Sequence, residues 1–71
     1  MDIKDFIQDK MSECEKRSKN WEERIECCSK AIGANPDNDV LIIENQKCIG
    51  KKNELLAVAD FCNELLSKYF S

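Results

Sequence analysis

The segment from Asn20 to Asn38 constrains the fold of this chain more than any other part of it. It begins with Asn20, a good helix-capping residue, continues with an amphipathic helical pattern, and stops at Asn35-Pro36. Asp37 or Asn38 then supplies the capping side chain of a new helix. Because the link between the two helices is short, we expect them to pack as antiparallel neighbours.

Size and composition narrow the class of protein. The chain has 71 residues, of which 42% are hydrophobic and 35% are charged, with two Gly and one Pro. This composition is typical of a folded, helix-rich domain and not of a disordered segment. So short a chain buries only a modest fraction of its surface, which favours dependence on a partner or a second copy. We expect one domain spanning residues 1–71.

Charge and hydropathy argue against two classes of partner. The net charge is −3, whereas nucleic-acid binding needs a positive surface. No apolar run approaches the roughly 20 residues that span a bilayer. The sequence that begins at Met1 lacks the basic start and apolar stretch of a signal peptide. We expect a cytoplasmic protein with no nucleic-acid partner and no membrane partner.

Capping signals recur along the chain at a regular step. Each signal places an Asp or Asn directly before an amphipathic helical pattern: Asp2, Asn20, Asp37 or Asn38, and Asn53. These signals predict breaks at 18–20, 35–36 and 50–53. Four helices are therefore expected, at about 2–18, 21–34, 38–51 and 54–70.

The second predicted helix resembles the corresponding helix of a tetratricopeptide repeat. In that family an aromatic residue opens the helix, a small residue lies late in it, and Pro closes the unit. Trp21, Ala31 and Pro36 occupy these places here. Shifting the chain by the repeat length of 34 residues aligns its apolar positions with one another. The resemblance implies an all-α helical repeat.

The fold class predicted from these signals is all-α, with four helices forming two stacked, tetratricopeptide-like antiparallel hairpins. The first hairpin covers about residues 2–35 and the second about residues 37–70. Trp21 is expected to pack between the first two helices. A generic four-helix bundle explains the same caps and apolar faces, and it remains the alternative.

The resemblance also implies a function, that of a non-catalytic adaptor that binds a protein or peptide segment. In tetratricopeptide arrays the first helix of each hairpin lines a concave groove. The matching residues here are Phe6, Asp9, Lys10, Glu13, Arg17, Ile43, Glu44, Lys47 and Lys51. The acidic residues among them would repel a carboxylate ligand, so a partner of mixed or basic character is expected.

The fourth predicted helix has more apolar residues than one buried face requires. Leu56, Phe61 and Phe70 lie outside the inward stripe centred on Cys62. They predict an association surface, used in a homodimer or a hetero-complex. The alternative function is therefore a small self-associating protein that acts as an inhibitor or as a subunit of a larger complex. Packing of these residues against the third helix is the simpler interpretation.

Five cysteines and the absence of His limit the possible chemistry. Zinc sites built from Cys alone usually contain two Cys-x-x-Cys pairs, which this chain lacks. The thiols are expected to be reduced and mostly buried, with a redox or metal-binding role as one alternative. Two disulfides, Cys14–Cys28 and Cys48–Cys62, are the other. Because no nucleophile–base pair stands out, we expect no enzyme activity, no catalytic residue, no metal site and no cofactor.

Overall fold

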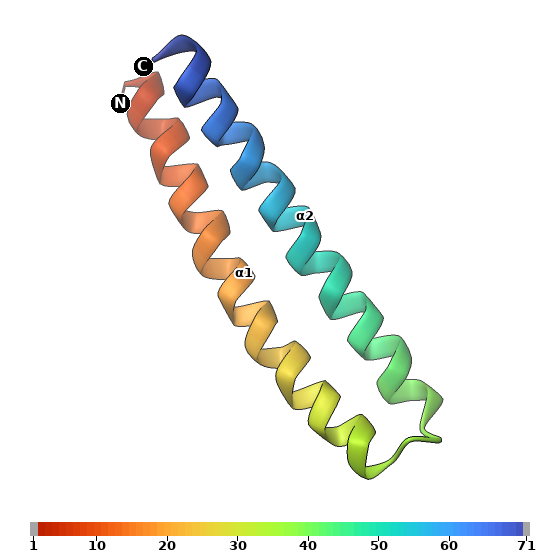
Figure 1. Ribbon diagram of the computed structural model, residues 1–71. Helices are drawn as coiled ribbons and strands as arrows, with labels where there is room; N and C mark the ends of the chain where they lie inside the picture. Colours follow the sequence, from red (N-terminus) through yellow and green to blue (C-terminus); the bar gives the residue numbers. More distant parts are fainter. Residues whose placement is uncertain (1, 71) are drawn as a thin grey trace.

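Two long helices joined by a short loop make up the described chain. The computed structural model describes residues 2–70, with α1 at Ile3–Ala34 and α2 at Asp39–Tyr69. The helices run antiparallel along their whole length, so the two termini lie together at the end opposite the loop (Figure 1). The described residues therefore form one extended, all-α helical hairpin.

The prediction of four helices is wrong. The predicted breaks at 18–20 and 50–53 lie inside α1 and α2, where the backbone remains helical. Each predicted hairpin is one continuous helix. Only the break at Asn35-Pro36 separates two helices. A single chain therefore forms neither two stacked tetratricopeptide-like hairpins nor the alternative four-helix bundle.

The helix ends follow the sequence signals closely. The Asp2 carboxylate accepts a hydrogen bond from the Lys4 amide at 3.3 Å, and caps α1. The Asn38 side chain accepts from the amides of Val40 and Leu41, and caps α2. At the end of α1 the Asn35 amide donates to two carbonyls of the last turn. The predicted caps at Asp2 and Asn38 are confirmed.

A heptad spacing explains why both helices are continuous. Along the contact between them, buried or half-buried residues recur at alternating steps of four and three, at positions termed layer positions here. In α1 the layer positions are Ile7, Met11, Cys14, Ser18, Trp21, Ile25, Cys28 and Ile32. In α2 they are Leu41, Asn45, Cys48, Lys52, Leu55, Ala59, Cys62 and Leu66. This average period of 3.5 residues keeps two helices in contact over many turns.

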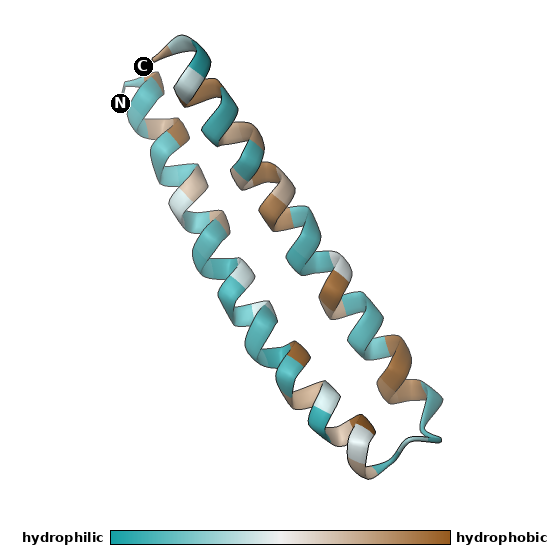
Figure 2. Cartoon of the chain, viewed as in Figure 1, coloured by the Kyte–Doolittle hydropathy of each residue, from teal (hydrophilic) through white to brown (hydrophobic). Residues whose placement is uncertain are grey.

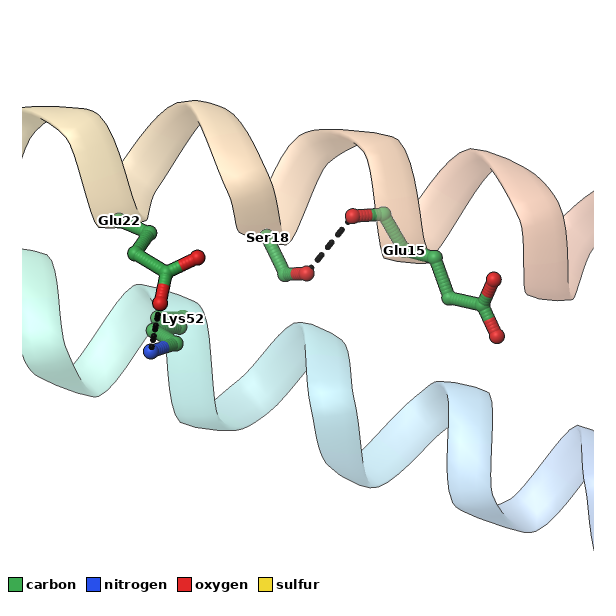
Figure 3. Close-up of polar contacts among 4 residues, drawn as sticks. All are labelled: Glu15, Ser18, Glu22 and Lys52. Carbon is green, nitrogen blue, oxygen red and sulfur yellow. Dashed lines mark hydrogen bonds and ion pairs between the residues drawn. The ribbon is translucent and has the colours of Figure 1, made fainter.

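Two polar layer residues lie where breaks were predicted, and each finds a partner without interrupting the helix (Figure 3). Ser18 is only 6% exposed, and its hydroxyl donates to the Glu15 carbonyl at 2.7 Å. Lys52 has a side chain 28% exposed, and its ammonium reaches the Glu22 carboxylate at 3.3 Å. The long stem of such a lysine covers apolar surface while its charge meets an anion. The helices therefore continue through both segments.

The buried core is thin. The buried hydrophobic residues are Cys14, Cys48, Ala59 and Cys62, all of them small. The radius of gyration is 16.0 Å, against about 11 Å for a compact domain of this length. The accessible surface is 5414 Å², against roughly 4,500 Å² for a compact protein of this mass. The hairpin thus exposes more surface than a self-sufficient domain.

Much of the exposed surface is apolar, and most of it belongs to α2. Figure 2 shows that hydrophobic residues are more frequent along α2 than along α1, which is largely hydrophilic. The large hydrophobic residues that are at least one third exposed are Ile3, Phe6, Val40, Ile42, Ile43, Leu56, Val58, Phe61, Tyr69 and Phe70. A hairpin of this kind offers apolar surface on more than one side.

Gly50 lies at a predicted break, so a substitution there tests whether α2 is continuous. It lies in mid-helix, without a positive φ, and a Cβ added there meets no atom within 4 Å. We expect Gly50→Ala to raise the free energy of unfolding by about 0.5–1 kcal/mol, because Ala loses less entropy in a helix. The reverse change at an exposed site seven residues further along α2, Ala57→Gly, should lower the free energy of unfolding by a similar amount. Urea unfolding measures both, and destabilisation by Gly50→Ala would indicate a helix end at this point.

Asn45 is the third polar layer residue, and its side-chain oxygen is buried without a hydrogen-bond partner. We expect Asn45→Leu to stabilise the hairpin by about 1–3 kcal/mol, since it removes an unsatisfied group and keeps a similar volume. Asn53→Leu, at an exposed position of the same helix, is the matched control and should change stability little. Thermal unfolding followed by circular dichroism gives both values. Equal shifts for the two variants would contradict a buried Asn45.

Candidate interaction surface

Two long sides of the hairpin flank the layer positions. In an antiparallel pair, residues that directly precede layer positions such as Ile25 and Ala59 lie on one side of both helices. Residues that directly follow Trp21 or Leu55 lie on the other side. The first is named the Trp21 side, after the half-buried ring that lies there, and the second the Leu56 side. The Glu22–Lys52 ion pair spans the two helices on the Leu56 side.

The Trp21 side is hollowed along the line where the helices meet. One hollow of about 810 Å³ is lined by Asn20, Trp21, Glu23, Arg24, Cys27, Cys28, Glu44, Lys47, Cys48 and Lys51. The next, of about 480 Å³, is lined by Lys10, Cys14, Arg17, Trp21, Lys51, Glu54, Leu55 and Val58. Because Trp21 and Lys51 belong to both, the hollows form one continuous groove.

Trp21 lies at the centre of this groove. The ring is half-buried at a layer position, between α1 and α2 and not between two N-terminal helices as predicted. The Arg24 guanidinium lies 4.6 Å from the ring centroid, in the arrangement of a cation–π contact. The groove therefore has an aromatic centre whose edge is open, with a cation held above it.

Most of the predicted groove residues lie on the Trp21 side, although the tetratricopeptide geometry that suggested them is absent. Five of them line the groove: Lys10, Arg17, Glu44, Lys47 and Lys51. Phe6, which is 60% exposed, and Glu13, which pairs with Arg17 at 4.0 Å, lie on the same side. Asp9 and Ile43 are exposed on the outer faces of their helices, away from the groove.

The Trp21 side is positively charged in a chain whose net charge is −3. At the positions directly beside the layers its cations are Lys10, Arg17, Arg24, Lys47, Lys51 and Lys68, and its anions are Glu13, Glu44 and Glu54. Glu23, one position further out on α1, also lines the groove. Six cations and three anions give a balance of +3 beside the layers, which Glu23 lowers to +2 when the groove rim is included. Three of the cations pair with carboxylates of their own helix, in exposed pairs that contribute little. A partner carboxylate can therefore compete for them.

The Leu56 side combines an apolar row with negative charge. The row repeats every seven residues along α2, except where Asn63 interrupts it, and comprises Ile42, Ile49, Leu56 and Phe70. The anions of this side are Asp5, Glu15, Glu22, Glu26, Asp39 and Asp60, and its cations are Lys19 and Lys52. The balance is −4. The two sides of the hairpin therefore carry opposite charge.

The predicted association residues do not form one patch. All three are exposed, Phe61 at 58%, Leu56 at 39% and Phe70 at 36%. Leu56 and Phe70 belong to the apolar row of the Leu56 side. Phe61 is nine residues from Phe70, which is half a turn around a helix with 100° per residue. It lies on the Trp21 side.

The contributions of Trp21, Arg24 and Val58 to the groove were missed by the sequence analysis. Trp21 was assigned to the interior, and neither Arg24 nor Val58 was counted among the groove residues. The signal that locates them is the heptad spacing, which runs through Ser18 and Lys52 without interruption. Once those polar residues are counted as layer positions, Arg24 and Val58 fall directly beside the layers.

The cysteines are free thiols, and three of them are buried. The alternative disulfides are excluded in this hairpin. Cys14 and Cys28 belong to the same helix, about 21 Å apart at 1.5 Å per residue, and Cys48 and Cys62 are equally far apart. A disulfide requires Cα atoms within about 7 Å. The Cys28 thiol meets the Cys48 thiol, which comes from the opposite helix.

Comparisons with known proteins give no match, whether with family models, curated proteins or solved structures. Within residues 2–70, no cluster of three or more His, Cys, Asp or Glu side chains could hold a metal ion. In the same residues, neither helix has a stretch apolar enough to cross a membrane. The candidate site is therefore defined by the two sides of the hairpin themselves.

Cys28, on the floor of the groove, makes the stability of the hairpin depend on pH. Burial, together with the neighbouring Cys48 thiol, raises the pKa of the Cys28 thiol above its usual value. Since the folded-state pKa is the higher one, the associated stability is present below the ordinary thiol pKa and is lost as pH rises through the folded value. We expect Cys28→Ala to show a smaller loss of stability between neutral and alkaline pH than the wild type. Urea unfolding against pH measures this, and an equal loss of stability in Cys28→Ala and the wild type would contradict the raised pKa.

Proposed function

We propose that this hairpin is a non-catalytic protein–protein interaction module that packs a helical partner against its Trp21 side. The observation that carries the proposal is the excess of exposed apolar surface over a core of four small residues. Soluble chains rarely leave contiguous apolar surface open unless it is covered by a partner. The groove on the Trp21 side is a hollowed part of that surface.

The shape of the groove favours a helix as the partner. It lies between two nearly parallel helical ridges, and a third helix can insert its own side chains into such a groove. Phe6, Val58 and Phe61 extend the apolar surface toward the termini, each at least 40% exposed. Burying side chains of this size contributes about 1.5–3 kcal/mol each before the cost of association.

The charges of the groove favour a partner segment with carboxylates beside its apolar stripe. The balance of +3 on this side opposes a basic partner and attracts an acidic one. In this respect the proposal differs from the mixed or basic partner expected from the sequence. We propose no catalytic activity and no cofactor for the chain, and a cytoplasmic location remains a prediction.

Self-association is the second candidate function, and one specific observation favours it. The Leu56 side carries its own exposed apolar row, so a partner on the Trp21 side leaves a second surface uncovered. A hairpin with two apolar sides is suited to be a subunit within a larger assembly.

Photo-crosslinking in the native source tests the proposed module. A photoreactive phenylalanine analogue placed at Lys47, on the groove rim, should form an adduct with a protein chain. The same analogue at Lys16, on the outer face of α1, is the matched control and should not. The adduct at position 47 should fall at least ~10-fold when Lys51→Glu and Val58→Glu are added, because both changes lie in the groove. Equal adducts at positions 47 and 16, or an adduct insensitive to the groove changes, would contradict the proposal.

A further inference from the structure

We infer that the Trp21 side binds the Leu56 side of a second copy of this chain, so that hairpins pack side against side in a head-to-tail row. The inference rests on the proposed function, and it names the partner of the same groove. It follows from a property of the whole hairpin: the chain carries on one side the surface that its other side is suited to bind.

The opposite charges of the two sides favour this pairing. The Trp21 side has a balance of +3 and the Leu56 side a balance of −4, and these groups lie on opposite sides of one slender body. Complementary potentials steer association and favour one pairing of surfaces over others. Every copy of this chain carries an acidic surface that can meet the Trp21 side of another copy, namely its Leu56 side.

The apolar residues of the two sides also favour this pairing. Leu56 and Phe70 belong to a row that runs along α2 at the spacing of seven residues, which is about 10.5 Å per step on a helix. The groove around Trp21 also runs along the helices and is open to side chains of that size. A row of aliphatic side chains beside carboxylates matches an apolar groove beside cations.

Like charge opposes the symmetric alternatives. A two-fold dimer through the Trp21 sides sets +3 against +3, and one through the Leu56 sides sets −4 against −4. Like charges brought together oppose binding. A two-fold dimer also covers only one side of each hairpin, whereas a head-to-tail contact covers both. Such contacts form closed rings or open chains according to their rotation.

One long side of the hairpin is large enough for a stable contact with a second copy. The hairpin measures 50 × 16 × 15 Å, so one long side presents roughly 800 Å², the area per partner of a standard protein interface. The contact thus needs no segment beyond the two helices.

Matched variants on the two sides test the inference. Lys51→Glu with Val58→Glu disables the Trp21 side, and Glu15→Lys with Leu56→Lys disables the Leu56 side. Each pair combines one charge reversal with one apolar-to-charged change at exposed positions. Lys16→Glu with Ala57→Glu applies the same pair of changes to the outer faces and is the control. Circular dichroism establishes that all variants keep the helix content of the wild type.

Sedimentation equilibrium gives the expected pattern. The wild type and the control should gain mass with concentration beyond a dimer, and less so in 1 M salt, because salt screens the opposed charges. Each disabled variant alone should associate at least ~10-fold more weakly. Mixed in equal amounts, the two should form a one-to-one dimer and stop there, since only one pair of intact sides remains.

Other outcomes overturn the inference. If the variant disabled on the Leu56 side still forms dimers alone, the contact is a symmetric one through the Trp21 sides. If the variant disabled on the Trp21 side still forms dimers alone, the contact is a symmetric one through the Leu56 sides. If the wild type is monomeric at millimolar concentration, the partner is a different protein. In that case a groove-dependent photo-adduct in the native source still supports the proposed module, so the two ideas fail separately.

Discussion

The most deeply buried part of the contact between α1 and α2 is made by small side chains, and the rest of the molecule depends on this. Cys14, Ser18 and Ala59 let the helices stay close over many turns, with a hydroxyl satisfied by its own backbone. The same small residues bury little apolar area, so the contact aligns the helices without giving the hairpin a substantial core. Stability of a chain this short is then expected to come partly from association.

Because the helices meet along one narrow line, both flanks of that line remain open. The large apolar residues of α2 are distributed on either side of the layers, with Leu56 on one side and Phe61 on the other. Charge follows the same division, positive around Trp21 and negative around Glu15 and Glu22. The hairpin is best understood as a two-sided element whose binding properties lie in the difference between its sides.

Local signals predicted the helix ends well and the helix interiors poorly. Asp2, Asn38 and Asn35-Pro36 function as predicted because each lies where the chain leaves the helix. Asn20 and Asn53 carry the same local signal but lie in mid-helix. An Asn caps a helix only if the residues before it adopt another conformation, and contact with the opposite helix holds them helical here. Most groove residues were still identified, since a residue keeps its place around a helix when a false break is removed.

The sequence by itself determined that residues 2–70 are helical apart from their ends and one short link, and that the two helices separate at Asn35-Pro36. These properties depend on residues close in the chain. Only the tertiary structure decided that Ser18 and Lys52 are layer residues, that Cys28 meets Cys48, and that Phe61 and Leu56 lie on opposite sides. The reason is physical: a helix contact brings together side chains that are distant in the chain, as Lys52 and Glu22 show at a separation of 30 residues. Which residues meet there is decided by the folded pair, although the Ser18 hydroxyl bonds to a carbonyl three residues away in its own helix.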